Sequence, residues 1–139
     1  MSEAVRFGVS ISPELIEQFD ELLTRRGYTN RSEAIRDLIR KELVEQEEIE
    51  GKEMVGTLTI IYDHHVRELS EELIRFQHDH HMHVLSSLHI HLDHNNCLEV
   101  IVVRGGGPKI KHLADRILAT KGVKHGRMVI TSTGGELPK

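Results

Sequence analysis

The chain has 139 residues, a formal net charge of −4, 11 histidines, 1 cysteine, 2 tyrosines and no tryptophan. This length allows one ordinary domain or two small ones. A single cysteine excludes an intrachain disulfide and fits a reducing compartment. No apolar run approaches the roughly 18 residues of a membrane span, and no secretory leader opens the chain. We therefore expect a cytoplasmic protein whose histidines carry metal or pH chemistry.

The distribution of charge is uneven along the chain. A negative total argues against nucleic-acid binding, because such surfaces are usually basic. Residues 1–41, however, contain seven Arg or Lys and seven Asp or Glu. The next stretch holds six glutamates: Glu42, Glu45, Glu47, Glu48, Glu50 and Glu53. A balanced DNA-binding segment followed by an acidic connector is compatible with the total.

The first 45 or so residues predict a strand and two helices. Residues 5–11 alternate apolar and polar side chains, the pattern of a half-buried strand. Ser12 and Pro13 then predict a helix start, as N-cap and first helical residue, and Gly27 is placed to end that helix. Asn30 caps a second predicted helix. A lone strand needs a partner, so we expect it to pair with the same strand of a second subunit in a dimer.

The rest of the chain predicts a second, mixed domain. The acidic run finishes the second helix, and Gly51 breaks it, so we place the domains at 1–50 and 51–139. The expected elements follow in order: strand 55–62, helix 66–83, strand 84–92, strand 97–103, helix 108–120 and strand 123–132. This βαββαβ order is the ferredoxin-like layout. The predicted fold class is therefore α+β.

A candidate metal site lies on the predicted hairpin of the second domain. His89 and His91 are two residues apart on a strand, so their imidazoles leave the same face, and Cys97 opens the next strand. Two nitrogens and one sulfur suit nickel, copper, zinc or cobalt, and disfavour magnesium or calcium. The histidine-rich stretch 77–83 could supply a fourth ligand. The spacing leaves open which histidine does so and whether it belongs to a neighbouring subunit.

Glu99 bears on whether this metal serves catalysis or sensing. It lies on the same strand face as Cys97, where it could act as a general base in a zinc hydrolase or orient a histidine. We favour orientation, because metal-bound histidines usually need a hydrogen-bond acceptor behind them. The predicted N-terminal DNA-binding domain also provides an activity that metal binding would regulate. The expectation is a regulator and not an enzyme.

At this point the sequence resembles the nickel-responsive ribbon-helix-helix regulators, the NikR family. The resemblance is carried by residues 26–37, Gln77-His78, His89-Ile90-His91, Cys97-Leu98-Glu99 and residues 122–126. It implies an N-terminal ribbon-helix-helix domain and a C-terminal ACT-like regulatory domain. It further implies a homotetramer, in which two ribbon-helix-helix dimers flank four regulatory domains. One square-planar Ni(II) per subunit would be held by His89, His91 and Cys97 and by His78 of a neighbouring subunit.

The resemblance also implies how DNA is read. Outward side chains of the N-terminal strand enter the major groove of a palindromic operator, and those positions are Arg6, Gly8 and Ser10. Gly8 departs from the family's usual small hydroxyl residue and offers no side-chain hydrogen bond. Glu33 and Asp37 match a possible second cation site; a solvated acidic pair is the alternative.

The function implied is nickel-dependent regulation, with nickel-bound protein repressing nickel uptake. Besides the zinc hydrolase considered above, three alternatives remain at this stage. The first is a regulator that responds to copper, cobalt or zinc. The second is a nickel-binding or storage protein that uses the histidine-rich stretch. The third is a module without metal regulation, such as an amino-acid-sensing ACT domain or an antitoxin-like regulator. The other histidines are expected to be surface groups or supplementary weak metal sites.

Overall fold

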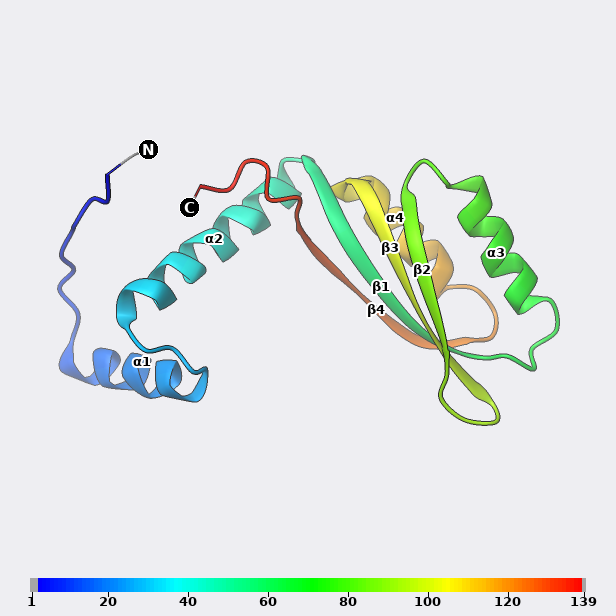
Figure 1. The fold of residues 1–139 in the computed structure, drawn as a ribbon, viewed down its shortest axis with the longest axis horizontal. Helices are drawn as coiled ribbons and strands as arrows, with labels where there is room; N and C mark the ends of the chain where they lie inside the picture. The colour runs from blue at the N-terminus through cyan, green and yellow to red at the C-terminus, as the bar shows by residue number, and fades with distance from the viewer. Residues whose placement is uncertain (1–2, 139) are drawn as a thin grey trace. The chain divides into compact units, whose positions relative to one another are not determined.

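The computed structural model describes residues 3–138 and divides into two compact units, residues 1–41 and 42–139 (Figure 1). The helices are α1 (Pro13–Arg25), α2 (Arg31–Ile49), α3 (Leu69–Asp79) and α4 (Gly107–Leu118), and the strands are β1 (Glu53–Asp63), β2 (Val84–His91), β3 (Asn96–Gly106) and β4 (Val123–Ser132). The contact boundary falls inside α2, because the last turns of that helix pack with the second unit. The sequence-based division at residue 50 stays a prediction.

The N-terminal unit contains α1 and the first part of α2. Both predicted helix starts are confirmed: the Ser12 hydroxyl accepts from the Leu15 N–H at 3.2 Å, and the Asn30 side-chain oxygen accepts from the Glu33 N–H at 2.9 Å. Gly27 has φ +79°, a left-handed conformation that glycine adopts without strain, directly after the first helix.

The predicted strand over residues 5–11 is not formed within this chain. The segment has no strand hydrogen bonds, and its apolar side chains are open to solvent, with Phe7 70% and Val9 64% exposed. The physical reason is that a strand exists only through its pairing, and the unit supplies no second strand.

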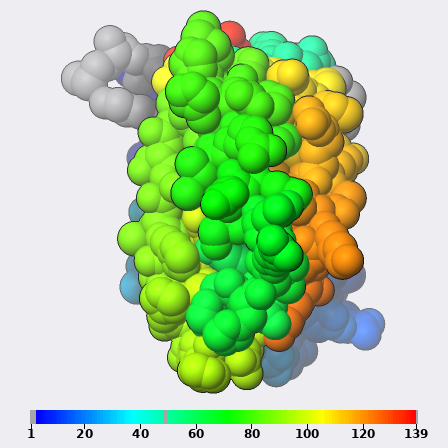
Figure 2. Space-filling view, turned by 90° about the vertical axis from the view of Figure 1, so that its right-hand side faces the viewer, coloured from blue at the N-terminus to red at the C-terminus, as the bar shows by residue number. Residues whose placement is uncertain are grey.

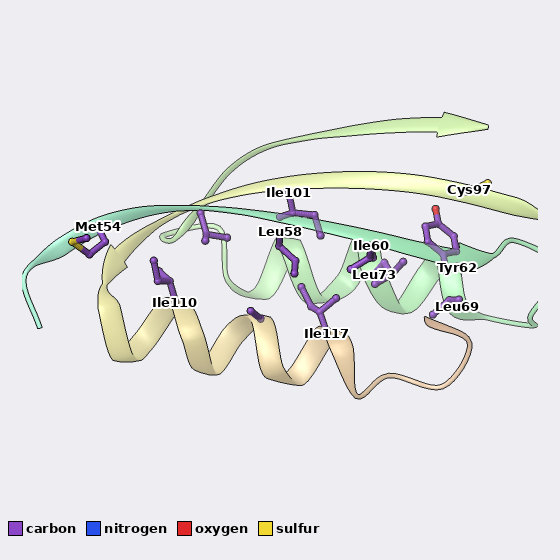
Figure 3. Packing of buried hydrophobic residues seen from close by; sticks show 12 residues of the cluster. Met54, Leu58, Ile60, Tyr62, Leu69, Leu73, Cys97, Ile101, Ile110 and Ile117 are labelled. Carbon is purple, nitrogen blue, oxygen red and sulfur yellow. The ribbon is translucent and has the colours of Figure 1, made fainter. Parts of the chain in front are cut away.

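The C-terminal unit is a four-stranded antiparallel sheet with two helices on one face. The strand order is β2-β3-β1-β4, as expected for βαββαβ connectivity, and all four predicted strands are present. Figure 3 shows α3 and α4 on the same side of the sheet, and Figure 2 shows them side by side over that face. The core between the layers consists of Met54, Leu58, Ile60, Tyr62, Leu69, Leu73, Cys97, Ile101, Val103, Ile110, Ala114 and Ile117.

Helix α3 is shorter than the expected 66–83. Glu68 has φ +69°, which an α-helix cannot contain, so the helix starts after it at Leu69. At the other end, residues 80–83 form turns. The carbonyls there accept from histidine rings, including Phe76 O from His80 Nδ1 and His78 O from His81 Nδ1. The same two carbonyls also accept from backbone N–H groups, Phe76 O from His80 at 3.1 Å and His78 O from His81 at 3.3 Å, so the imidazoles supplement the backbone donors beyond Asp79.

The sheet face opposite α3 and α4 carries apolar side chains as well. Strand register places Leu88 and Val100 opposite each other on it, and Ile90 opposite Leu98. Leu88 is 57% exposed and Val129, on β4, is 60% exposed. Exposed apolar side chains gathered on one face of a sheet are typical of a protein–protein contact.

Candidate metal centre

The structure brings together the three side chains that the spacing had singled out. His89 and His91 lie on β2, and His91 is directly opposite Cys97 on β3. One ligand atom from each of the three residues lies within 4.8 Å of the others. Within residues 3–138, this is the one group of three or more His, Cys, Asp or Glu side chains with that geometry.

The distances within the group fit a shared metal ion. His91 Nδ1 lies 3.4 Å from Cys97 Sγ. A nitrogen about 2.0 Å and a sulfur about 2.3 Å from one metal stand about 3 Å apart at a right angle, and about 3.5 Å apart at a tetrahedral angle. Little movement is therefore needed for these two atoms to bind a common ion.

The electrostatic surroundings of Cys97 favour a cation. Burial raises the pKa of the Cys97 thiol, and so do the negative charges of Asp93, Asp63 and Glu99. The same three carboxylates attract a divalent ion. A bound metal would displace the thiol proton, because the thiolate is the form that ligates.

Tyr62 is a site residue that the sequence reasoning missed. It is buried on β1 opposite Cys97, and its hydroxyl lies 3.4 Å from His89 Nε2. Burial, reinforced by Glu99 and Cys97, raises the pKa of Tyr62 to about 12, so the phenol keeps its proton and can both donate and accept. The alternation of β1 would have placed Tyr62 on the core face, but the strand pairing that sets it beside His89 was not evident.

Glu99, which was expected to orient a metal-bound histidine, lies next to His89 on the neighbouring strand. It is buried and pairs with His89 across β2 and β3. Its carboxylate accepts from Gln77 Nε2 of α3 at 3.1 Å. Burial raises the pKa of Glu99, against the opposing effects of His89 and of the Gln77 hydrogen bond. Glu99 therefore links α3 to the ligand strands, and its predicted role behind a metal-bound histidine stays a prediction.

His78 does not join the group within this chain. It is exposed in the last turn of α3, and its nearest ring neighbour is His81, with centroids 6.3 Å apart. A fourth ligand contributed by His78 of another subunit stays a prediction.

Several of the remaining histidines have structural partners. Nε2 of both His64 and His65 donates to the carbonyl oxygen of His94. His83 Nδ1 donates to the Arg104 carbonyl at 3.1 Å, and the His80 ring stacks on Phe76 with centroids 4.2 Å apart. These contacts account for part of the unusual histidine content without a metal.

The predicted DNA-reading residues lie in the extended N-terminal segment. Arg6, Gly8 and Ser10 are all exposed. A side chain added at Gly8 would meet nothing within 4 Å, so the missing hydroxyl is not imposed by packing within the chain.

Glu33 and Asp37, the predicted second cation pair, lie one turn apart on α2. The Asp37 carboxylate is already engaged: it accepts from the Tyr28 hydroxyl at 2.6 Å and from Arg40 at 2.9 Å. Both the second cation site and the alternative of a solvated acidic pair stay predictions.

Two family models match this chain. "NikR C terminal nickel binding domain" matches residues 55–131, and "Ribbon-helix-helix protein, copG family" matches residues 5–46. The first range includes all the clustered ligands, and the second includes the predicted ribbon.

Relatives match along almost the whole chain. A protein of Geobacter sulfurreducens is 57% identical over 138 residues, and one of Geotalea uraniireducens is 55% identical over 138 residues; each alignment covers 99% of both chains. Both carry the name "Putative nickel-responsive regulator". An uncharacterized protein from Thermotoga maritima of known structure shares 15% identity, with a TM-score of 0.51 over 57% of this chain and 98% of its own. That likeness concerns the fold alone.

In the part of the chain that the structure describes, no helix has the length and apolar character needed to cross a membrane.

Proposed function

Because this chain belongs to the NikR family, we propose that it is a nickel-responsive, sequence-specific DNA-binding regulator. The observation that carries the proposal is the convergence of His89, His91 and Cys97 ligand atoms within 4.8 Å on a two-stranded scaffold. Relatives of more than 50% identity are named as regulators, which argues against an enzymatic role.

Nickel would be held by His89, His91 and Cys97 of one subunit and by His78 of a neighbouring subunit, with one ion per subunit. Nitrogen and sulfur donors suit late transition metals, and a planar arrangement of four donors suits Ni(II), while zinc prefers a tetrahedron. The bound ion would supply a cross-link between the subunits that provide its ligands. Tyr62 and Glu99 would hold the imidazole of His89 in place from behind.

The assembly proposed is a homotetramer made of two ribbon-helix-helix dimers. Two features support it: the exposed apolar side chains of residues 5–11, and the open apolar face of the sheet with Leu88 and Val129. The first surface would close by strand pairing between subunits, and the second by packing of regulatory units. Two ribbon heads related by symmetry would recognise a palindromic double-stranded operator.

Arg6, Gly8 and Ser10 would face the bases, with Arg6 the side chain suited to guanine. Glu33 and Asp37 are the candidates for a second cation. The biological outcome proposed is repression of nickel uptake when nickel is bound. Coupling is reciprocal: if nickel tightens DNA binding, DNA tightens nickel binding by the same factor.

Operator binding measured against Ni(II), Cu(II), Co(II) and Zn(II) at one fixed salt concentration tests this function. We expect nickel to give the largest gain in DNA affinity. Equal activation by zinc or copper would transfer the assignment to another metal. Several nickel ions per chain without sequence-specific DNA binding would favour a storage protein. Identical nickel affinity with and without operator would overturn the coupling.

A further inference from the structure

The turn that joins two of the clustered ligands is held from outside the hairpin. Residues 92–96, here called the ligand turn, connect His91 at the end of β2 to Cys97 on β3. Polar surface turns of this kind are usually mobile. The ligand turn, in contrast, is tied on one side to β4 and on the other to the loop after β1.

Asn96 is the point of attachment on the β4 side. The Lys124 ammonium of β4 donates to the Asn96 side-chain oxygen. The Asn96 backbone N–H and side-chain NH₂ both donate to Asp93, at 2.8 and 3.1 Å to Oδ1. One amide side chain thus connects β4 to the turn, at the residue immediately before Cys97.

The loop after β1 supplies the second attachment. His64 and His65 both donate through Nε2 to the His94 carbonyl, and the His64 backbone N–H donates to the Asn95 carbonyl at 3.2 Å. The His64 ring also meets the His91 ring edge-on, with centroids 5.5 Å apart. The middle of the ligand turn and its end next to Cys97 are therefore restrained by residues far away in the sequence.

We propose that Lys124, acting through Asn96, is a positioning residue for nickel: it holds the ligand turn so that His91 and Cys97 keep their chelating separation. The inference rests on the proposed function and extends it to a residue outside the ligand set. Without this attachment, the turn would sample arrangements in which the two ligand atoms are farther apart. Nickel would then have to order the turn as it binds, and the measured affinity would fall accordingly.

The direction in which nickel affinity changes when Lys124 is removed distinguishes a positioning role from a purely electrostatic one. Hydrogen bonds from Asn96 and Asn95 lower the pKa of Asp93, and the nearby charge of Lys124 lowers it further. If its charge were all that mattered, its removal would tighten binding of a divalent cation. If it positions the turn, its removal weakens binding.

The test is nickel affinity of the full-length protein, measured by competition with a chelator, for wild type, Lys124→Met, Lys124→Arg and the control Lys121→Met. We expect Lys124→Met to lose between about tenfold and a hundredfold in affinity, the range typical of residues that support metal ligands, and to show a weakened nickel–thiolate absorption band. Lys124→Arg, which keeps a donor, should recover most of the affinity. Lys121→Met should behave as wild type.

Unchanged or tighter nickel binding in Lys124→Met would overturn the inference and leave the proposed function standing. A wild-type protein that fails to bind nickel would instead remove the proposed function. Lys124 is exposed, so the variant should keep the thermal unfolding midpoint of the metal-free protein. Asn96→Ala provides a second variant, which should lose at least as much affinity as Lys124→Met; retention of full affinity there would also contradict the inference.

Discussion

The two units of this chain differ in how much of their apolar surface they bury by themselves. In the C-terminal unit, a sheet and two helices enclose a core in which Met54, Ile60 and Ile110 are fully buried. In the N-terminal unit, Phe7 and Val9 are mostly exposed, while Leu23 and Ala34 are buried. A segment of about 40 residues rarely encloses a sufficient core alone.

This difference in apolar burial indicates where we expect contacts between subunits. In the N-terminal unit, the apolar side chains of residues 5–11 have no strand partner, so we expect a second copy of the chain to pair with them. In the C-terminal unit, three of the four proposed ligands lie together and His78 is exposed, so the proposed metal site takes its fourth ligand from a second copy. Folding of the N-terminal unit and metal binding by the C-terminal unit would thus both depend on association with a second subunit.

The largest effect should come from the metal ligands of the C-terminal unit. Cys97→Ala removes the one sulfur donor, and we expect nickel affinity to fall by more than about a hundredfold, beyond the usual cost of losing a supporting residue. His112→Ala, which changes a histidine of α4, is the matched control and should bind nickel normally. Calorimetric titration measures both; normal binding by Cys97→Ala would remove Cys97 from the site.

A charge on the apolar side of residues 5–11 should disrupt the N-terminal unit and leave the C-terminal unit intact. Val9→Asp would leave an unpaired charge in a strand-paired dimer, at a cost of about 3 kcal/mol or more, and DNA binding should be lost. Gln18→Asp puts the same charge on an exposed position of α1 and should be tolerated. Gel-shift assays with circular dichroism check both variants. Intact DNA binding in Val9→Asp would show that residues 5–11 do not form the dimer ribbon.

Alanine substitutions at Gly126 and Gly8 compare how tightly the two units are packed. A methyl group at Gly126 would lie 2.8 Å from both Ile60 Cγ2 and the Thr59 carbonyl, so Gly126→Ala should destabilise the protein by about 1–3 kcal/mol. Gly8→Ala meets no neighbour and should change stability by less than about 0.5 kcal/mol. Urea unfolding measures the difference, and equal effects would contradict the contrast in packing.

The metal site alone should show a further effect, a dependence of nickel affinity on pH. The raised pKa of Cys97 leaves its thiol protonated at neutral pH, and nickel must displace that proton. Apparent nickel affinity should therefore rise by about tenfold per pH unit between about pH 7 and 8, and fall as the pH is lowered. Isothermal titrations in buffers of different pH measure the slope. An affinity that does not change over this range would mean that Cys97 is already ionised.

The local sequence pattern was sufficient to predict most of the helices and strands. The Ser12-Pro13 start, the alternation of β1 and the spacing of His89, His91 and Cys97 each depend on near neighbours in the chain, and each was recognisable. The extent of α3 was not, because neither the left-handed conformation of Glu68 before the helix nor the hydrogen bond from His83 to the distant Arg104 carbonyl after it was evident from the sequence.

What the amino-acid sequence determined by itself was the fold class, the order of elements and three candidate ligands on one hairpin. Only the tertiary structure decided that Tyr62 stands behind His89, that Gln77 bonds to Glu99, and that Lys124 reaches Asn96. The physical reason is distance along the chain. Helix and strand periodicity and turn chemistry act over a few residues, whereas these three contacts join residues more than 20 positions apart, which only the strand register and the helix packing bring together.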